Sequence, residues 1–97
     1  EQVVGYRARQ VLTQPRHEIQ EYDESAWVGL YPEVDVETAL GTFLAARRWN
    51  LHLFRGLGPA PLARVSSHPR RGDEPLATTL RALAGHTFSH LGQLNAL

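Results

Sequence analysis

The sequence has no cysteine, lysine or methionine among its 97 residues. Without cysteine, the chain has neither a disulfide framework nor thiolate ligands for a metal ion. Its apolar runs are short, whereas a membrane-spanning helix needs about 20 consecutive apolar residues. Ten basic residues, all arginine, balance ten acidic ones, and this zero net charge argues against nucleic-acid or membrane partners. We therefore expect a cytoplasmic globular protein.

The absence of methionine also means that Glu1 is not an encoded start. We accordingly expect the chain to be a fragment of a longer protein. Its apolar content of 42% suffices for a folded core, and its length fits one small domain covering residues 1–97.

Three amphipathic segments make up most of the pattern. The first runs from about Gln2 to Leu12 and stops before Pro15. The second follows Asp35, a plausible N-cap, and ends before the Gly56-Leu57-Gly58-Pro59 stretch. The third begins after Asp73, again a plausible N-cap. No strand pattern of any length is present, so the sequence predicts an all-α fold.

The third segment carries two histidines, His86 and His90, four residues apart. This spacing places both side chains on one helix face, close enough to reach one metal ion. His90 also falls on the apolar stripe, which predicts that it faces the core. The members of that stripe are Leu76, Leu80, Leu83, Thr87, His90, Leu94 and Leu97.

A core-facing imidazole needs a partner for its ring nitrogens. The residues alone leave two interpretations of His90 open: a core histidine bonded to a neighbouring helix, or a metal ligand. A zinc protease is excluded, because Thr87 stands where its motif requires a glutamate as general base.

The segment His86-Thr87-Phe88-Ser89-His90-Leu91-Gly92-Gln93-Leu94 resembles the last helix of the DinB-like (DinB/YfiT) metalloenzymes, which ends His-x-x-x-His-x-x-Gln followed by Ile or Leu. Three other stretches are similar to that family: residues 1–12, residues 21–27 and residues 64–72. The resemblance implies a four-helix up-and-down bundle, of which this chain supplies about three helices. The first helix and the start of the second would be missing.

The resemblance further implies a three-histidine metal site. His86 and His90 match two of the ligands, and the third would lie upstream of Glu1. The implied ion is divalent, with zinc, nickel and iron all suited to histidine. The implied activity is that of a transferase or hydrolase acting on a small molecule, with a low-molecular-weight thiol as possible co-substrate.

Five further residues are candidates for the pocket or for support of the ligands. Arg47 interrupts an apolar stripe and either extends to solvent or binds an anionic substrate group. Gln93 either supports a ligand or bonds a neighbouring helix. Tyr22 and Trp27 either pack over the end of the bundle or form a pocket wall. The resemblance places His68 near the open end of the bundle, although a loop histidine before proline is more often structural or exposed.

His17 is expected to be solvated, and His52 lies on a polar helix face, which makes it a poor third ligand. The competing hypothesis for the whole chain is a non-catalytic helical module that forms a homodimer, with His86 and His90 as structural core residues. An incomplete bundle favours dimerisation in either case, because its apolar stripes would need a cover.

Overall fold

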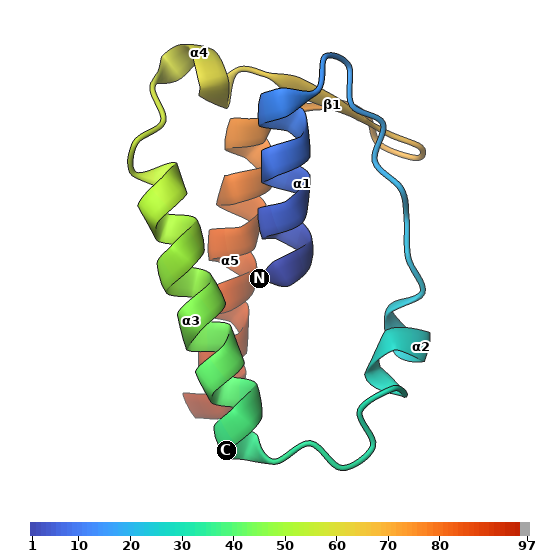
Figure 1. The fold of residues 1–97 in the computed structure, drawn as a ribbon, viewed down its shortest axis with the longest axis vertical. Helices are drawn as coiled ribbons and strands as arrows, with labels where there is room; N and C mark the ends of the chain where they lie inside the picture. Colours follow the sequence, from blue (N-terminus) through green and yellow to red (C-terminus); the bar gives the residue numbers. More distant parts are fainter. Residues whose placement is uncertain (96–97) are drawn as a thin grey trace.

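The computed structural model describes residues 1–95 and shows a mostly helical protein with one small sheet (Figure 1). Three long helices run side by side, and a long arc containing a short helix connects the first two. The elements in chain order are α1 (Gln2–Thr13), α2 (Glu24–Val28), α3 (Val36–Phe54), α4 (Pro59–Leu62), β1 (Val65–His68), β2 (Gly72–Pro75) and α5 (Leu76–Asn95). No helix within residues 1–95 has the length and apolar character to cross a membrane.

The helix boundaries follow local chemistry at most ends. The Asp35 carboxylate accepts a hydrogen bond from the backbone N–H of Thr38 at 2.9 Å, which confirms the predicted N-cap of α3. Asp23 caps α2 in the same way through Ala26. Helix α1 ends at Thr13, two residues before Pro15. In its last turn, the Val11 carbonyl accepts a hydrogen bond from the Arg64 side chain.

The prediction that the chain has no strand is wrong. Strands β1 and β2 form an antiparallel hairpin, and Gly72 takes a positive φ of 78° where β2 begins. A buried histidine, His68, holds the turn, because its Nδ1 accepts the backbone N–H groups of Arg70 and Arg71, each at 3.1 Å. Such short polar strands give no alternating pattern in the sequence, so only the tertiary partners reveal them.

The predicted N-cap at Asp73 is also wrong. Asp73 lies in β2 opposite Ser67, and α5 begins three residues later at Leu76. Glu74 instead accepts a hydrogen bond from the Thr79 hydroxyl at 3.2 Å and pairs with Arg71. Residues that the sequence predicted for the first turn of α5 therefore belong to the hairpin.

The core lies where α1 meets α5 and the last turn of α3. Its fully buried members are Ala8, Val11 and Leu76, with Leu12, Phe54, Leu57 and Leu80 packed around them. Figure 1 shows why the core is confined to one end: α1 starts beside the middle of α5 and runs only toward the hairpin. The other halves of α3 and α5 extend beyond it.

The exposure of α5 therefore increases along its length. Leu76 is buried, Leu80 and Thr87 are half-buried, and His90 is exposed. The prediction that His90 faces the core is wrong for this structure, because no described segment packs over that part of the helix. Leu97, the last position of the predicted stripe, and the side chain of Leu94 lie outside what the structure describes.

Helix α1 lies against the Asn50 side chain of α3 at Gly5. A Cβ atom at this position would lie 2.5 Å from the Oδ1 atom of Asn50, a buried side chain on α3. Glycine is therefore required here because of the limited space. The backbone conformation does not require it, because any residue adopts the helical conformation of Gly5.

We predict that Gly5→Ala lowers the free energy of unfolding by about 1–3 kcal/mol, because the new methyl group overlaps Asn50. The matched control is Gly41→Ala in α3, where a Cβ meets nothing within 4 Å. There the change should stabilise the protein by about 0.5–1 kcal/mol through helix propensity. Urea unfolding of both variants measures the difference, and a neutral Gly5→Ala would contradict the close approach.

Candidate functional site

The two histidines of the α5 motif lie against each other on the helix surface. Their Nε2 atoms are 2.9 Å apart, and the rings meet nearly edge to face at 78°. His90 Nδ1 lies 2.9 Å from Oε1 of Gln93, an oxygen that only accepts, so Nδ1 carries a proton. In the neutral ring this leaves His90 Nε2 as an acceptor, and it receives its hydrogen bond from His86 Nε2.

The spacing of the two nitrogens is compatible with binding to one metal ion. Imidazole nitrogens bind zinc at about 2.0–2.1 Å, which separates two tetrahedral ligands by roughly 3.3 Å, close to the spacing observed between the two Nε2 atoms. The hydrogen bond to Gln93 fixes the orientation of the His90 ring. Metal-binding histidines are commonly oriented by a hydrogen bond of this kind to their other ring nitrogen. Within residues 1–95, however, no third His, Cys, Asp or Glu completes a group of three. The ligand roles of His86 and His90 stay a prediction.

Arg47 lies beside this pair but neither extends to solvent nor stands free in a pocket. Its guanidinium forms an ion pair with Glu1 and donates to the Thr87 hydroxyl at 2.8 Å. Thr87 follows His86 directly, so the contact joins α3 to the histidine-bearing part of α5. Because Glu1 neutralises Arg47, this geometry does not favour the predicted role in binding an anionic substrate group.

Glu1 is the centre of a larger buried network. Its carboxylate, with only 3% of the side chain exposed, also accepts from Asn50 Nδ2 at 2.9 Å. Asn50 Oδ1 in turn accepts from Arg9 at 2.8 Å. Burial by itself would raise the pKa of the Glu1 carboxyl, but the hydrogen bonds from Asn50 and Arg47 and the charge of Arg47 outweigh it and lower this pKa. Glu1 is therefore held ionised.

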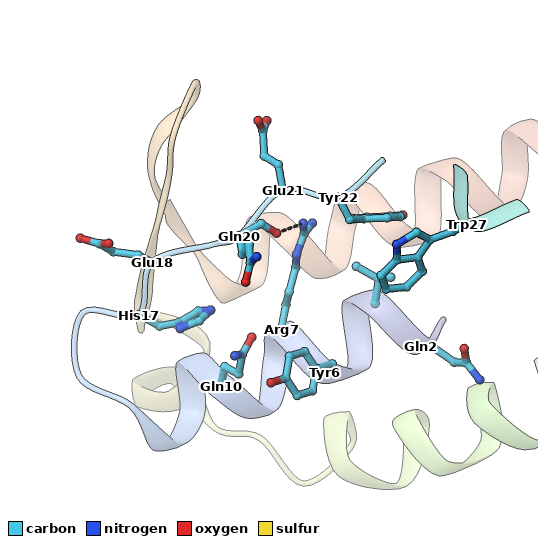
Figure 2. A pocket seen from close by; sticks show the side chains of 11 residues that line it. Gln2, Tyr6, Arg7, Gln10, His17, Glu18, Gln20, Glu21, Tyr22 and Trp27 are labelled. Atoms are coloured by element: carbon cyan, nitrogen blue, oxygen red, sulfur yellow. Dashed lines mark hydrogen bonds between the residues drawn. The ribbon is translucent and has the colours of Figure 1, made fainter. Parts of the chain in front are cut away.

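Tyr22 and Trp27 do not pack over the end of the bundle. Their rings lie 4.6 Å apart, beside α1, on the arc that leads into and through α2. Together with α1 they line a groove of about 680 Å³, in which Arg7 lies over the Tyr22 ring (Figure 2). The groove is formed by α1 and residues 17–27, whereas His86 and His90 lie on α5, and neither histidine contributes to its lining.

The hairpin positions two other histidines, of which only His17 differs from expectation. His68 is buried at the hairpin, and its Nε2 lies 3.8 Å from the Glu21 carboxylate at the rim of the groove. His17, expected to be solvated, is half-buried and lines the same groove. This burial results from the hydrogen bond between the backbones of Ser67 and His17. The two residues lie far apart in the sequence, so no local pattern predicts the contact. His52, as expected, is exposed and stacks on Trp49.

A family model described as the DinB superfamily matches residues 1–94. The chain belongs to the DinB superfamily. Searches of characterised proteins and of solved structures each found no significant match. The DinB match covers the α5 histidine motif, the Glu1 network and the aromatic groove alike.

We predict that Glu1→Gln destabilises this DinB-superfamily chain by about 1–3 kcal/mol at pH 7, because a buried charge-assisted network is lost. The folded-state pKa of Glu1 is lowered, so its contribution is complete above its ordinary pKa of 4.5 and is lost as pH falls through the lower folded value. The wild-type and variant stabilities should therefore converge as pH falls below 4.5.

The control for this measurement is Glu33→Gln, at an exposed carboxylate in the loop before α3. It should change the free energy of unfolding by less than about 0.5 kcal/mol. Urea unfolding between pH 3 and pH 7 gives both curves. A Glu1→Gln difference that does not vary with pH would contradict the network's charge.

Proposed function

We propose that the protein is a divalent-metal-dependent enzyme of the DinB class, of the thiol-dependent transferase or hydrolase type. His86 and His90 would hold the ion with a third histidine upstream of Glu1. The observation that supports this proposal is the paired Nε2 atoms at 2.9 Å, with His90 oriented by Gln93. The proposed metal is zinc, nickel or iron, and the proposed location is the cytoplasm.

The chain's own residues contribute binding and position. Gln93 keeps the His90 proton on Nδ1, so the Nε2 lone pair, which here accepts from His86, is the one that would bind an ion. Arg47 of α3 binds Glu1 at the start of α1 and Thr87 of α5, so its contacts hold the three helices together next to His86. When bound, the ion would lower the pKa of a coordinated water to about 7 or activate a thiol in the same way.

We also propose that the intact protein forms the four-helix bundle of its family. The support comes from apolar side chains of α3 that the described residues leave uncovered: Leu40 is 52%, Phe43 39% and Leu44 48% exposed. An amphipathic helix with its apolar stripe in water requires a partner. A further helix of the same chain would bury these side chains and enclose the histidines.

The same uncovered side chains favour a second candidate function, a non-catalytic module in which another copy of the chain supplies the cover. Homodimerisation alone does not separate the two, because an enzyme of this class can also be a dimer. Metal binding does separate them, since a structural module has no use for the imidazole lone pairs of His86 and His90.

We predict that the intact protein, including the region upstream of Glu1, retains about one divalent ion per chain after exposure to zinc, nickel and iron and extensive dialysis. His86→Ala and His90→Ala should each abolish retention, because every lost ligand weakens a three-nitrogen site severely. His52→Ala, which changes an exposed histidine on α3, is the matched control and should retain the ion. Elemental analysis measures all four proteins.

Retention should also depend on pH. Ligating imidazoles must be neutral, so the ion is expected to dissociate as pH falls below about 6. If His90→Ala binds the metal as tightly as wild type, the site assignment is wrong. If the wild-type protein retains no ion at pH 7, the dimerisation module becomes the better interpretation.

A further inference from the structure

The groove beside α1 is a second candidate site, separate from the histidine pair and independent of the proposed metal chemistry. Its volume of about 680 Å³ falls within the range of roughly 300–1,000 Å³ that is usual for small-molecule sites. Helix α1 uses two faces: Ala8 and Val11 enter the core, whereas Tyr6, Arg7 and Gln10 face the groove.

The opposite wall of the groove is held in place by the hairpin. The backbone of Ile19 donates to Ser67 at 2.8 Å, and Ser67 donates to the His17 carbonyl at the same distance. Farther along, Glu21 pairs with Arg70 of the hairpin turn at 2.7 Å. Because these bonds fix residues 17–21 against the sheet, the groove is formed before any ligand enters.

Arg7 provides an uncompensated positive charge in the middle of the groove. Its Nη2 donates to the Gln20 carbonyl at 3.1 Å, and among residues 1–95 no carboxylate forms an ion pair with it. Figure 2 shows the carboxylates of Glu18 and Glu21 turned away from Arg7. The remaining guanidinium donors suit a carboxylate, which they bind with charge-assisted hydrogen bonds.

One end of the groove presents an aromatic surface. Trp27 is 51% exposed although it contacts Tyr22 at a centroid distance of 4.6 Å. An exposed indole beside a second ring gives a flat apolar wall against which a planar ligand gains both burial and aromatic contact.

His17 lies at the other end of the groove. Its Nδ1 lies 3.1 Å from Oε1 of Gln14 and donates to it. Its Nε2 atom is buried and has no hydrogen-bond partner among the described residues. Because this atom has almost no accessible surface, a ligand in the groove does not reach it. In Figure 2, Arg7 lies between His17 and Trp27.

We propose that this groove binds an aromatic carboxylate. The ring lies against Trp27 and Tyr22, and the carboxylate binds Arg7. This ligand differs from a simple anion and from a neutral aromatic compound, and each part of it corresponds to one feature of the groove.

The test uses phenyllactate as the probe and two compounds that each lack one part: phenyllactamide lacks the charge and lactate the ring. Binding is followed by Trp27 fluorescence in a Trp49→Phe background of the intact protein, since residues 1–97 contain only these two tryptophans. Phenyllactate should bind saturably, and each of the other compounds should bind at least several-fold more weakly. The affinity should be the same with chelator and with added zinc, because the groove is separate from His86 and His90.

Variants assign the contacts. Arg7→Gln should weaken phenyllactate binding roughly tenfold, whereas Arg48→Gln, at an exposed arginine on α3, should leave it unchanged. Circular dichroism confirms that each variant is folded.

Three results would each overturn the proposal: no saturable binding of phenyllactate, equal binding of phenyllactamide, or unchanged binding by Arg7→Gln. None of them bears on metal retention, so this proposal and the proposed metal site fail or stand separately.

Discussion

The close approach of α1 to α3 at Gly5 is the constraint on which the arrangement of the three helices depends. The absence of a side chain there lets Asn50 reach the α1 backbone, where its Nδ2 donates to the Glu1 carbonyl at 3.2 Å and to the Glu1 carboxylate. Arg9 and Arg47 then bond to either end of the pair formed by Asn50 and Glu1. Buried polar groups are stable only when their hydrogen bonds are satisfied, so these residues specify one mutual position of the helices.

That network connects the packed end of the protein to the histidine pair. The hydrophobic core lies toward the hairpin, and beyond it the helices are joined by the polar contact from Glu1 through Arg47 to Thr87. Side chains on an exposed helix surface need such fixing, because loosely held side chains lose geometric precision. The DinB superfamily sequence thus places its most conspicuous motif at the edge of the described core.

The hairpin has a comparable role for the aromatic groove. His68 holds its turn, Ser67 bonds the passing chain at residues 17–19, and Arg70 binds Glu21. A long connection between two helices is normally variable and mobile, but here its first part is bound to β1 through a parallel bridge between Glu18 and Ser67. The groove wall therefore has a defined position relative to α1, which places Tyr22 near Arg7.

The sequence by itself determined the helical class, the α3 boundaries through Asp35 and the glycine-rich stretch, and the family through the spacing of His86, His90 and Gln93. These features depend on residues within a few positions of one another. Tertiary structure alone decided the hairpin, the burial of His68, the pairing of Arg47 with Glu1 and the exposure of His90. Each of these depends on which distant segment lies opposite, and neither helical periodicity nor capping carries that information.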